Sequence, residues 1–92
     1  MRIIVAPRAL DDIERLVQWL LDVDAEQAAA RAKHTIEAAI DSLEEFPERG
    51  ASRGRGMREL FAPFGNGAYV LRYRVGPNSV LIARIRHSRE LG

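Results

Sequence analysis

The chain has 92 residues, of which 47% are hydrophobic and 29% charged, a composition typical of one globular domain over residues 1–92 and not of a disordered segment. It contains no cysteine and only two histidines, which excludes disulfides and thiolate metal sites and argues against a structural zinc site. The formal net charge of +1 conceals an asymmetry, because residues 1–50 carry −5 and residues 51–92 carry +6.

The first half of the chain predicts a short strand followed by two helices. The β-branched run at 2–5 is typical of a strand, and Pro7 suits the first turn of a helix. Apolar side chains then recur at helical spacing, first up to residue 21 and again over 25–46, where Pro47 ends the pattern. The second segment is rich in alanine, which lets two helices approach closely, so we expect an antiparallel helical hairpin.

No apolar run approaches the roughly 20 residues that cross a bilayer. The short N-terminal apolar run is followed at once by acidic residues, unlike a secretory signal. We therefore expect a cytoplasmic protein that does not bind membranes.

After a glycine- and arginine-rich loop at 47–56, the hydrophobic period becomes two, which indicates strands. Three strands are predicted, at 57–61, 68–75 and 79–87, separated by turn sequences. The order β-α-α-β-β-β keeps helices and strands apart and indicates an α+β fold. In this fold the N-terminal strand and the helical hairpin pack on one face of a small antiparallel sheet.

The alternation of side chains along the last two strands predicts which face the arginines occupy. We assign the odd positions to the helices and the even positions to the opposite face. The inward set is then Tyr69, Leu71, Tyr73, Val75, Leu81, Ala83, Ile85 and His87, and the outward set is Val70, Arg72, Arg74, Val80, Ile82, Arg84 and Arg86. This register pairs odd with odd positions through a loop of three or five residues around 76–78. A two-residue loop at Pro77–Asn78 would put arginines on both faces.

The main candidate site is the outward cluster of Arg72, Arg74, Arg84 and Arg86, which Arg58, Arg53 and Arg55 could border. A solvated sheet face is the simple alternative. Against it, four like charges on adjacent strands repel one another, and an anionic partner would offset that repulsion. Arginine alone is used, and its planar fork suits phosphate or carboxylate, so nucleic acid or an acidic protein is the expected partner.

Chemistry of a metal-free ribonuclease needs an acid, a base and cations that stabilise the developing charge. If the chain is such an enzyme, the candidates are His87 as acid or base, Glu59 as base, and Arg84 and Arg58 as cations. The alternation along the strand places His87 on the face that the helices cover, which counts against a catalytic role for this residue. No phosphate loop, nucleophile elbow, paired-carboxylate site or metal-ligand spacing is present, and no cofactor is expected.

Five segments in order span nearly the whole chain: APRALDDIERLVQWL, IEAAIDSLEEFPERG, MRELF, YVLRYRV and VLIARIRHSRE. Their order and spacing resemble the RelE/ParE superfamily of toxins from bacterial type II toxin–antitoxin modules. That superfamily includes ribosome-dependent mRNA interferases, the RelE type, and poisons of DNA gyrase, the ParE type. The chain has no tyrosine after His87 and no lysine in its C-terminal half, and its H-S-R ending is similar to that of the ParE branch.

The resemblance implies a toxin that poisons DNA gyrase and blocks replication, with a role in plasmid stabilisation and a cognate antitoxin as partner. An mRNA interferase acting at the ribosome is the alternative, and a non-toxic protein-binding module is a second one. The resemblance gives weight to Arg84, Arg86, His87 and Arg89, and to Arg58 of the REL string. With the parity assignment, the expected target-binding set is Arg58, Arg72, Arg74, Arg84, Arg86, His87 and Arg89.

Overall fold

The computed structural model describes residues 1–90, so the last two residues of the expected domain, 91–92, lie outside the described residues. The elements follow in the order β1 (Arg2–Val5), α1 (Pro7–Asp22), α2 (Glu26–Glu45), β2 (Ala51–Ser52), β3 (Met57–Phe64), β4 (Gly67–Val75) and β5 (Ser79–His87). The predicted α+β class and order of elements are confirmed, with the two-residue strand β2 in addition. Within residues 1–90, no helix is both long enough and apolar enough to cross a membrane.

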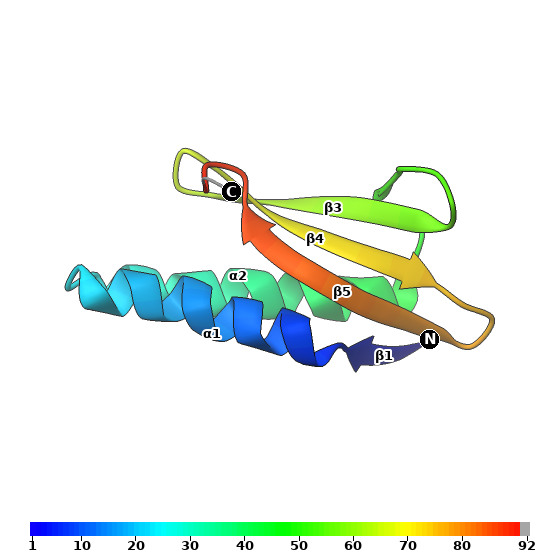
Figure 1. Ribbon diagram of the computed structural model, residues 1–92, viewed down its shortest axis with the longest axis horizontal. Helices are drawn as coiled ribbons and strands as arrows, with labels where there is room; N and C mark the ends of the chain where they lie inside the picture. Colours follow the sequence, from blue (N-terminus) through cyan, green and yellow to red (C-terminus); the bar gives the residue numbers. More distant parts are fainter. Residues whose placement is uncertain (91–92) are drawn as a thin grey trace.

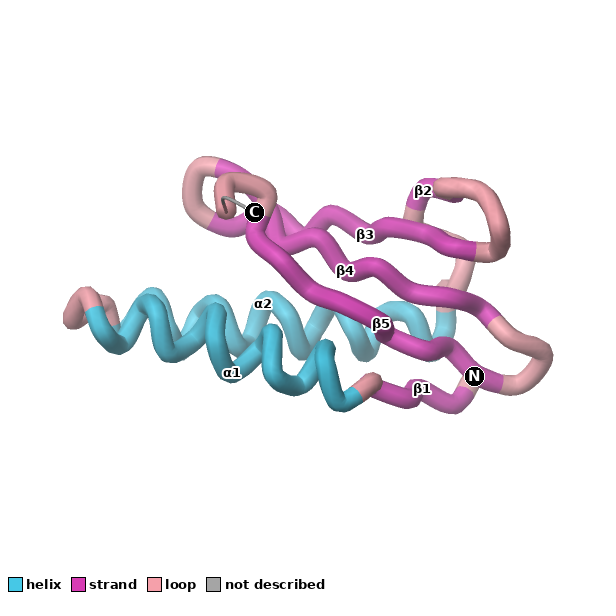
Figure 2. The backbone as a smooth tube through the Cα atoms, viewed as in Figure 1, coloured by secondary structure: helices cyan, strands magenta, loops and turns pink. Residues whose placement is uncertain are grey.

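The molecule has two layers, with α1 and α2 side by side across one face of a five-stranded sheet (Figure 1). The strand order is β1-β5-β4-β3-β2 (Figure 2). Neighbouring strands are antiparallel except β1 and β5, which pair in parallel from Arg2↔Ser79 to Val5↔Ile82. The sheet is therefore mixed, whereas the sequence indicates antiparallel pairing only. A parallel pair needs a long crossover, and the helical hairpin supplies the greater part of it.

The core lies between the helices and the sheet face that they cover. On α2, Ala32 and Ala39 are buried and let the helix approach its neighbours closely. Larger buried side chains fill the space between the layers: Leu16, Ile36, Leu43, Leu71, Tyr73, Ile82 and Ile85. Burial of each large aliphatic side chain contributes about 1.5–3 kcal/mol, so this packing fixes the sheet relative to the helices.

The loop after α2 is fastened to the sheet by Tyr73 and Arg58. The hydroxyl of Tyr73 donates to the carbonyl of Pro47 at 2.8 Å and accepts the N–H of Gly50 at 2.9 Å. A Cβ at Gly50 would lie 2.5 Å from this hydroxyl, so no larger residue fits there. Arg58 Nη1 donates to the carbonyls of Gly50 at 2.7 Å and Glu48 at 3.2 Å.

The register between β4 and β5 changes along their length. From Tyr69 to Arg72 on β4, odd positions pair with odd positions of β5, as in Leu71↔Ile85, which agrees with the predicted register. Nearer the turn the pairing is Tyr73↔Ile82 and Val75↔Val80, because a β-bulge leaves Ala83 without a partner of its own.

The bulge makes the predicted faces wrong in the first half of β5. Val80 and Ile82 are fully buried against the helices, whereas Leu81 is 38% exposed. The turn itself closes with the N–H of Gly76 donating to the carbonyl of Ser79 at 2.8 Å, which leaves only Pro77 and Asn78 at the tip, so the predicted loop of three or five residues is wrong. The extra residue in β5 shifts the register between the two strands. The tight turn can therefore form while Val80, Ile82 and Ile85 all face the helices.

Candidate functional site

The sheet face that the helices leave uncovered, called here the open face, carries the predicted arginine cluster. Cross-strand pairing puts Arg72 opposite Arg84, Arg86 opposite Val70, and Arg74 opposite Leu81. From β3, this face also takes Met57, Glu59 and Phe61, which pair with Arg74, Arg72 and Val70. The four arginines are all exposed.

The β-bulge at Ala83 lets Arg84 and Arg86 share the open face with Arg72. Without it, the register set by the Val75↔Val80 pair would put Arg84 opposite Leu71, whose side chain is fully buried in the core. Bulges are common next to functional sites because they redirect side chains.

At the edge of the open face beside α1 there is a hollow of about 450 Å³. Its lining comes from α1, β3, β4, β5 and the turn after β5: Arg15, Glu59, Val70, Arg72, Arg84, Ile85, Arg86 and Glu90. Val70 is only 1% exposed, although both helices lie on the opposite face of the sheet (Figure 1). The rest of the lining is almost entirely charged, and arginines outnumber acids.

The carboxylate of Asp12, on α1, binds two arginines that line the hollow and a main-chain N–H at the edge of β5. Its oxygens accept hydrogen bonds from Arg84 Nε at 2.9 Å, Arg84 Nη2 at 3.1 Å, Arg15 Nη2 at 3.1 Å and the N–H of Ile85 at 2.8 Å. Arg15 Nη2 also donates to the carbonyl of Ile85 at 3.4 Å. Strand β1 pairs with β5 only as far as Ile82. Beyond it, Asp12 and Arg15 bind the main-chain N–H and carbonyl of Ile85, which a neighbouring strand would otherwise pair with.

The pKa of Asp12 reflects two opposing effects. Burial disfavours its charged form and raises the pKa, but the hydrogen bonds from Arg84, Ile85 and Arg15 outweigh it, and the net pKa lies below the usual 3.8. The hydrogen bond with Asp12 also raises the pKa of Arg84. Arg84 is therefore held as a fixed, permanently charged side chain at the rim of the hollow.

Glu90 closes the far side of the hollow. One of its oxygens accepts a hydrogen bond from Arg15 Nη1, and the other accepts the N–H of His87 at 2.9 Å. Together, Asp12 and Glu90 neutralise Arg84 and Arg15. Within residues 1–90, the side chains of Arg72 and Arg86 have no ion-pair partner, so they carry the uncompensated charge of the hollow.

The remaining arginines near the open face contact the protein itself. Arg74 donates to the carbonyl of Arg55 at 3.0 Å. Arg53 forms an ion pair with Glu59 at 2.9 Å and lies 6.0 Å above the ring of Phe61, which is 45% exposed. These contacts extend the cationic surface from β5 towards the loop before β3.

His87 lies on the helix side of the sheet, as predicted. Its ring makes an edge contact with Tyr69, with the centroids 5.1 Å apart. Nε2 lies 3.0 Å from the carbonyl of Phe64, and Nδ1 accepts the N–H of Arg89 at 3.2 Å. These partners fit the neutral tautomer with the proton on Nε2, donating to Phe64. The side chain of Arg89 is exposed.

Arg58 does not join the arginine cluster. It pairs across β3 and β4 with Tyr73, which faces the helices, and its guanidinium binds the loop after α2. The four residues considered for a ribonuclease are therefore divided between two faces. Glu59 and Arg84 lie on the open face, whereas His87 and Arg58 lie on the other.

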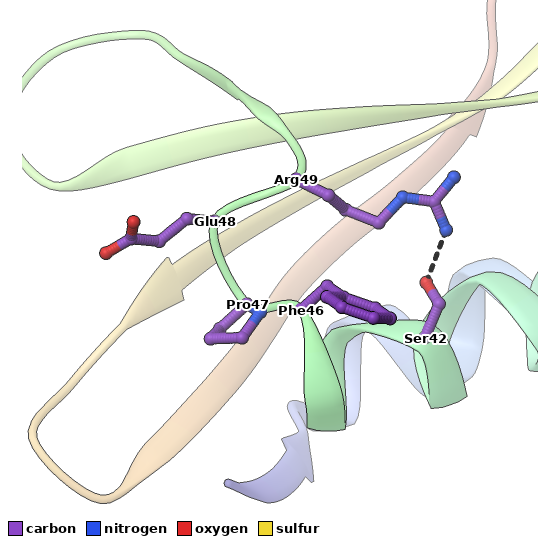
Figure 3. A pocket seen from close by; sticks show the side chains of 5 residues that line it. All are labelled: Ser42, Phe46, Pro47, Glu48 and Arg49. Atoms are coloured by element: carbon purple, nitrogen blue, oxygen red, sulfur yellow. Dashed lines mark hydrogen bonds between the residues drawn. The ribbon is translucent and has the colours of Figure 1, made fainter.

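A second hollow, of about 720 Å³, lies where α2 ends (Figure 3). Ser42, Phe46, Pro47, Glu48 and Arg49 line it, and Arg49 Nη1 donates to Ser42 Oγ at 2.7 Å. None of the predicted site residues contributes to this hollow. Among residues 1–90, no group of three or more histidine or acidic side chains is placed to hold a metal ion.

Sequence reasoning missed Asp12, Arg15 and Glu90. Asp12 did carry a signal, because it occupies the buried stripe of α1 between Ala9 and Leu16, where an apolar residue is expected. An acid at such a position needs a cationic or N–H partner, which a search among the arginines would have sought. Arg15 and Glu90 gave no comparable signal.

Comparisons with known proteins agree with this architecture. The model of the family described as "ParE toxin of type II toxin-antitoxin system, parDE" matches residues 3–92. Two similar proteins of Caulobacter vibrioides are Toxin RelE1, 48% identical over 96% of this chain and 94% of its own length, and Toxin RelE3, 44% identical over 94% and 92%. A solved structure titled "Chromosomal ParDE TA system from P. aeruginosa" superposes with a TM-score of 0.77 over 95% of both chains at 20% identity, which shows a shared fold. The chain belongs to the ParE toxin family of type II toxin–antitoxin systems, within the RelE/ParE superfamily.

Proposed function

We propose that this toxin poisons DNA gyrase and thereby blocks replication, and that its open-face arginines contact the target. The observation that carries the proposal is the position of His87. Both of its ring nitrogens are engaged by main-chain groups, and it lies on the opposite face from Arg84 and Glu59. A hydrolytic site built from these residues would have no acid and base facing one substrate.

A poison that acts by binding needs only a fixed surface. Arg84 is fixed by Asp12, and Arg72 and Arg86 project beside it without a partner of their own among residues 1–90. Membership of a type II toxin–antitoxin family also implies a cognate antitoxin, which neutralises the toxin.

The alternative is an mRNA interferase that acts at the ribosome. The similar proteins of Caulobacter vibrioides carry RelE names, and an arginine-rich surface also suits RNA. In this case the ribosome would have to supply groups that the chain does not bring together.

The two functions are distinguished by testing purified protein in two assays. We expect inhibition of gyrase supercoiling and no cleavage of ribosome-bound message. Cleavage of the message with supercoiling unaffected would favour the interferase. Normal bacterial growth when the chain is expressed without an antitoxin would contradict both.

A further inference from the structure

We propose that the open-face hollow is a phosphodiester-binding site for a nucleic-acid backbone, in which the carboxylate of Glu90 holds the place of a phosphate oxyanion. This goes beyond gyrase poisoning, because it assigns a ligand that the chain would bind directly, whether or not gyrase is its target.

The arrangement of cations is the first argument. Arg72 and Arg84 lie opposite each other on neighbouring strands, with their Cα atoms about 5 Å apart. The Cα atom of Arg86 lies two residues further along β5, about 7 Å from that of Arg84. The β-bulge at Ala83 keeps all three on one face. A backbone that carries one negative charge per nucleotide fits such regularly spaced arginines, whose planar forks bind phosphate oxygens in pairs.

Glu90 is the second argument. Its two oxygens are held by the guanidinium of Arg15 and by the N–H of His87. A cation together with a main-chain N–H is the donor set that proteins use for a phosphate oxygen. An oxyanion therefore already occupies these donors at the rim of the hollow, and a phosphate that binds Arg15 and the N–H of His87 would have to displace it.

The hollow suits a nucleic acid better than an acidic protein segment. A protein partner usually gains most of its affinity from apolar anchors in a central pocket. Here the apolar lining residues, Val70 and Ile85, are each 1% exposed, and the exposed apolar side chains of the open face, Ile4, Phe61 and Leu81, lie outside the lining. Charge is what this surface offers, and charge supplies most of the affinity for a nucleic-acid backbone.

The test is direct binding of the purified 92-residue chain, by fluorescence anisotropy, to a short duplex DNA and to a single-stranded RNA of equal length. We expect affinity for at least one of them to fall linearly with the logarithm of salt concentration between about 50 and 200 mM. The double variant Arg72→Gln/Arg86→Gln should weaken binding and reduce the salt slope by about 2. These side chains have no ion pair among residues 1–90, so the variant should fold, as a thermal melt can verify.

Two further variants sharpen the test. Arg31→Gln/Lys33→Gln removes the same charge from exposed positions of α2 and should leave the salt slope nearly unchanged. Glu90→Gln removes the competing carboxylate and should tighten binding, a gain that a poorly folded variant would not show.

The proposal is overturned if neither polymer binds at the lowest salt, or if the α2 control loses as much affinity as the open-face variant. Tighter binding of a polyglutamate peptide than of either polymer, lost in the Arg72/Arg86 variant, would instead identify an acidic protein as the ligand. Binding of RNA alone would support the phosphodiester site and count against gyrase, whereas DNA binding without gyrase inhibition would leave the site standing and remove the proposed target.

Discussion

Arg84 and Asp12 are separated by 72 residues in sequence, yet the guanidinium of one donates to both carboxylate oxygens of the other, at 2.9 and 3.1 Å. The same carboxylate accepts the N–H of Ile85, so one side chain of α1 fixes both the edge of β5 and the direction of an arginine at the candidate site. Asp12 therefore contributes both to the stability of the fold and to the position of Arg84 at the candidate site.

Asp12→Asn should lower the free energy of unfolding by roughly 1–3 kcal/mol, because the buried amide replaces a charged acceptor and cannot satisfy Arg84, Arg15 and the N–H of Ile85 equally well. Urea denaturation at neutral pH measures this change. An unchanged midpoint would show that the network contributes nothing to the fold.

The pH dependence of stability follows from the same residue. The folded-state pKa of Asp12 lies below 3.8, so its contribution is fully present above that unfolded-state value. The contribution should be lost as the pH falls below 3.8 and through the lowered folded-state pKa. Asp12→Asn should remove this part of the acid-induced loss, and parallel pH profiles for the two proteins would contradict the assignment.

Tyr73→Phe should destabilise the protein by about 1–3 kcal/mol. The substitution leaves the N–H of Gly50 and the carbonyl of Pro47 without their partner in a buried place. Thermal or urea unfolding checks the value. Tyr69→Phe is a useful comparison, because no hydrogen bond of its hydroxyl is present among residues 1–90 and its loss should cost less.

Arg58→Gln and Arg86→Gln should separate stability from toxicity. Arg58 holds two carbonyls of the loop after α2, so its loss should cost roughly 1–2 kcal/mol and reduce toxicity only through loss of folded protein. The side chain of Arg86 has no ion pair or hydrogen bond within the described residues 1–90, and its loss should change stability by less than about 0.5 kcal/mol while reducing toxicity. Growth inhibition and unfolding measured on both variants test this, and the reverse pattern would contradict it.

His87→Gln should keep most of the toxicity, within about threefold, because the amide can still donate to the carbonyl of Phe64 on the helix side of the sheet. A loss of several hundredfold with intact folding would instead match removal of a general acid or base, whose contribution is about 10²–10⁴-fold. Growth inhibition together with a thermal melt distinguishes the two results.

Much of the fold could be predicted because its signals are local. Helical spacing and Pro47 predicted both helices to within a few residues, and the change to a period of two predicted three strands. The strand β2 has only two residues, too few for any alternation to be visible. The predicted strand 57–61 continues to Phe64, because the turn with β4 is confined to Gly65 and Asn66, where Gly65 takes a positive φ of 62°.

The site could be predicted only in part because it depends on long-range pairing. Alternation indicated that Arg72, Arg84 and Arg86 share a face, but the bulge at Ala83 depends on how the turn and the core are satisfied together. For the same reason, the sequence did not reveal that Asp12 reaches Arg84, or that Arg58 turns towards the loop after α2.

The most direct test of the account is gyrase-mediated DNA cleavage measured with the wild-type chain, with Arg72→Gln/Arg86→Gln, and with the charge-matched control Arg31→Gln/Lys33→Gln. The account predicts that cleaved DNA accumulates with the wild type and the control, and that the open-face variant needs a concentration higher by about tenfold or more to reach the same level. An absence of cleaved DNA with the folded wild-type protein, or equal potency of all three proteins, would contradict it.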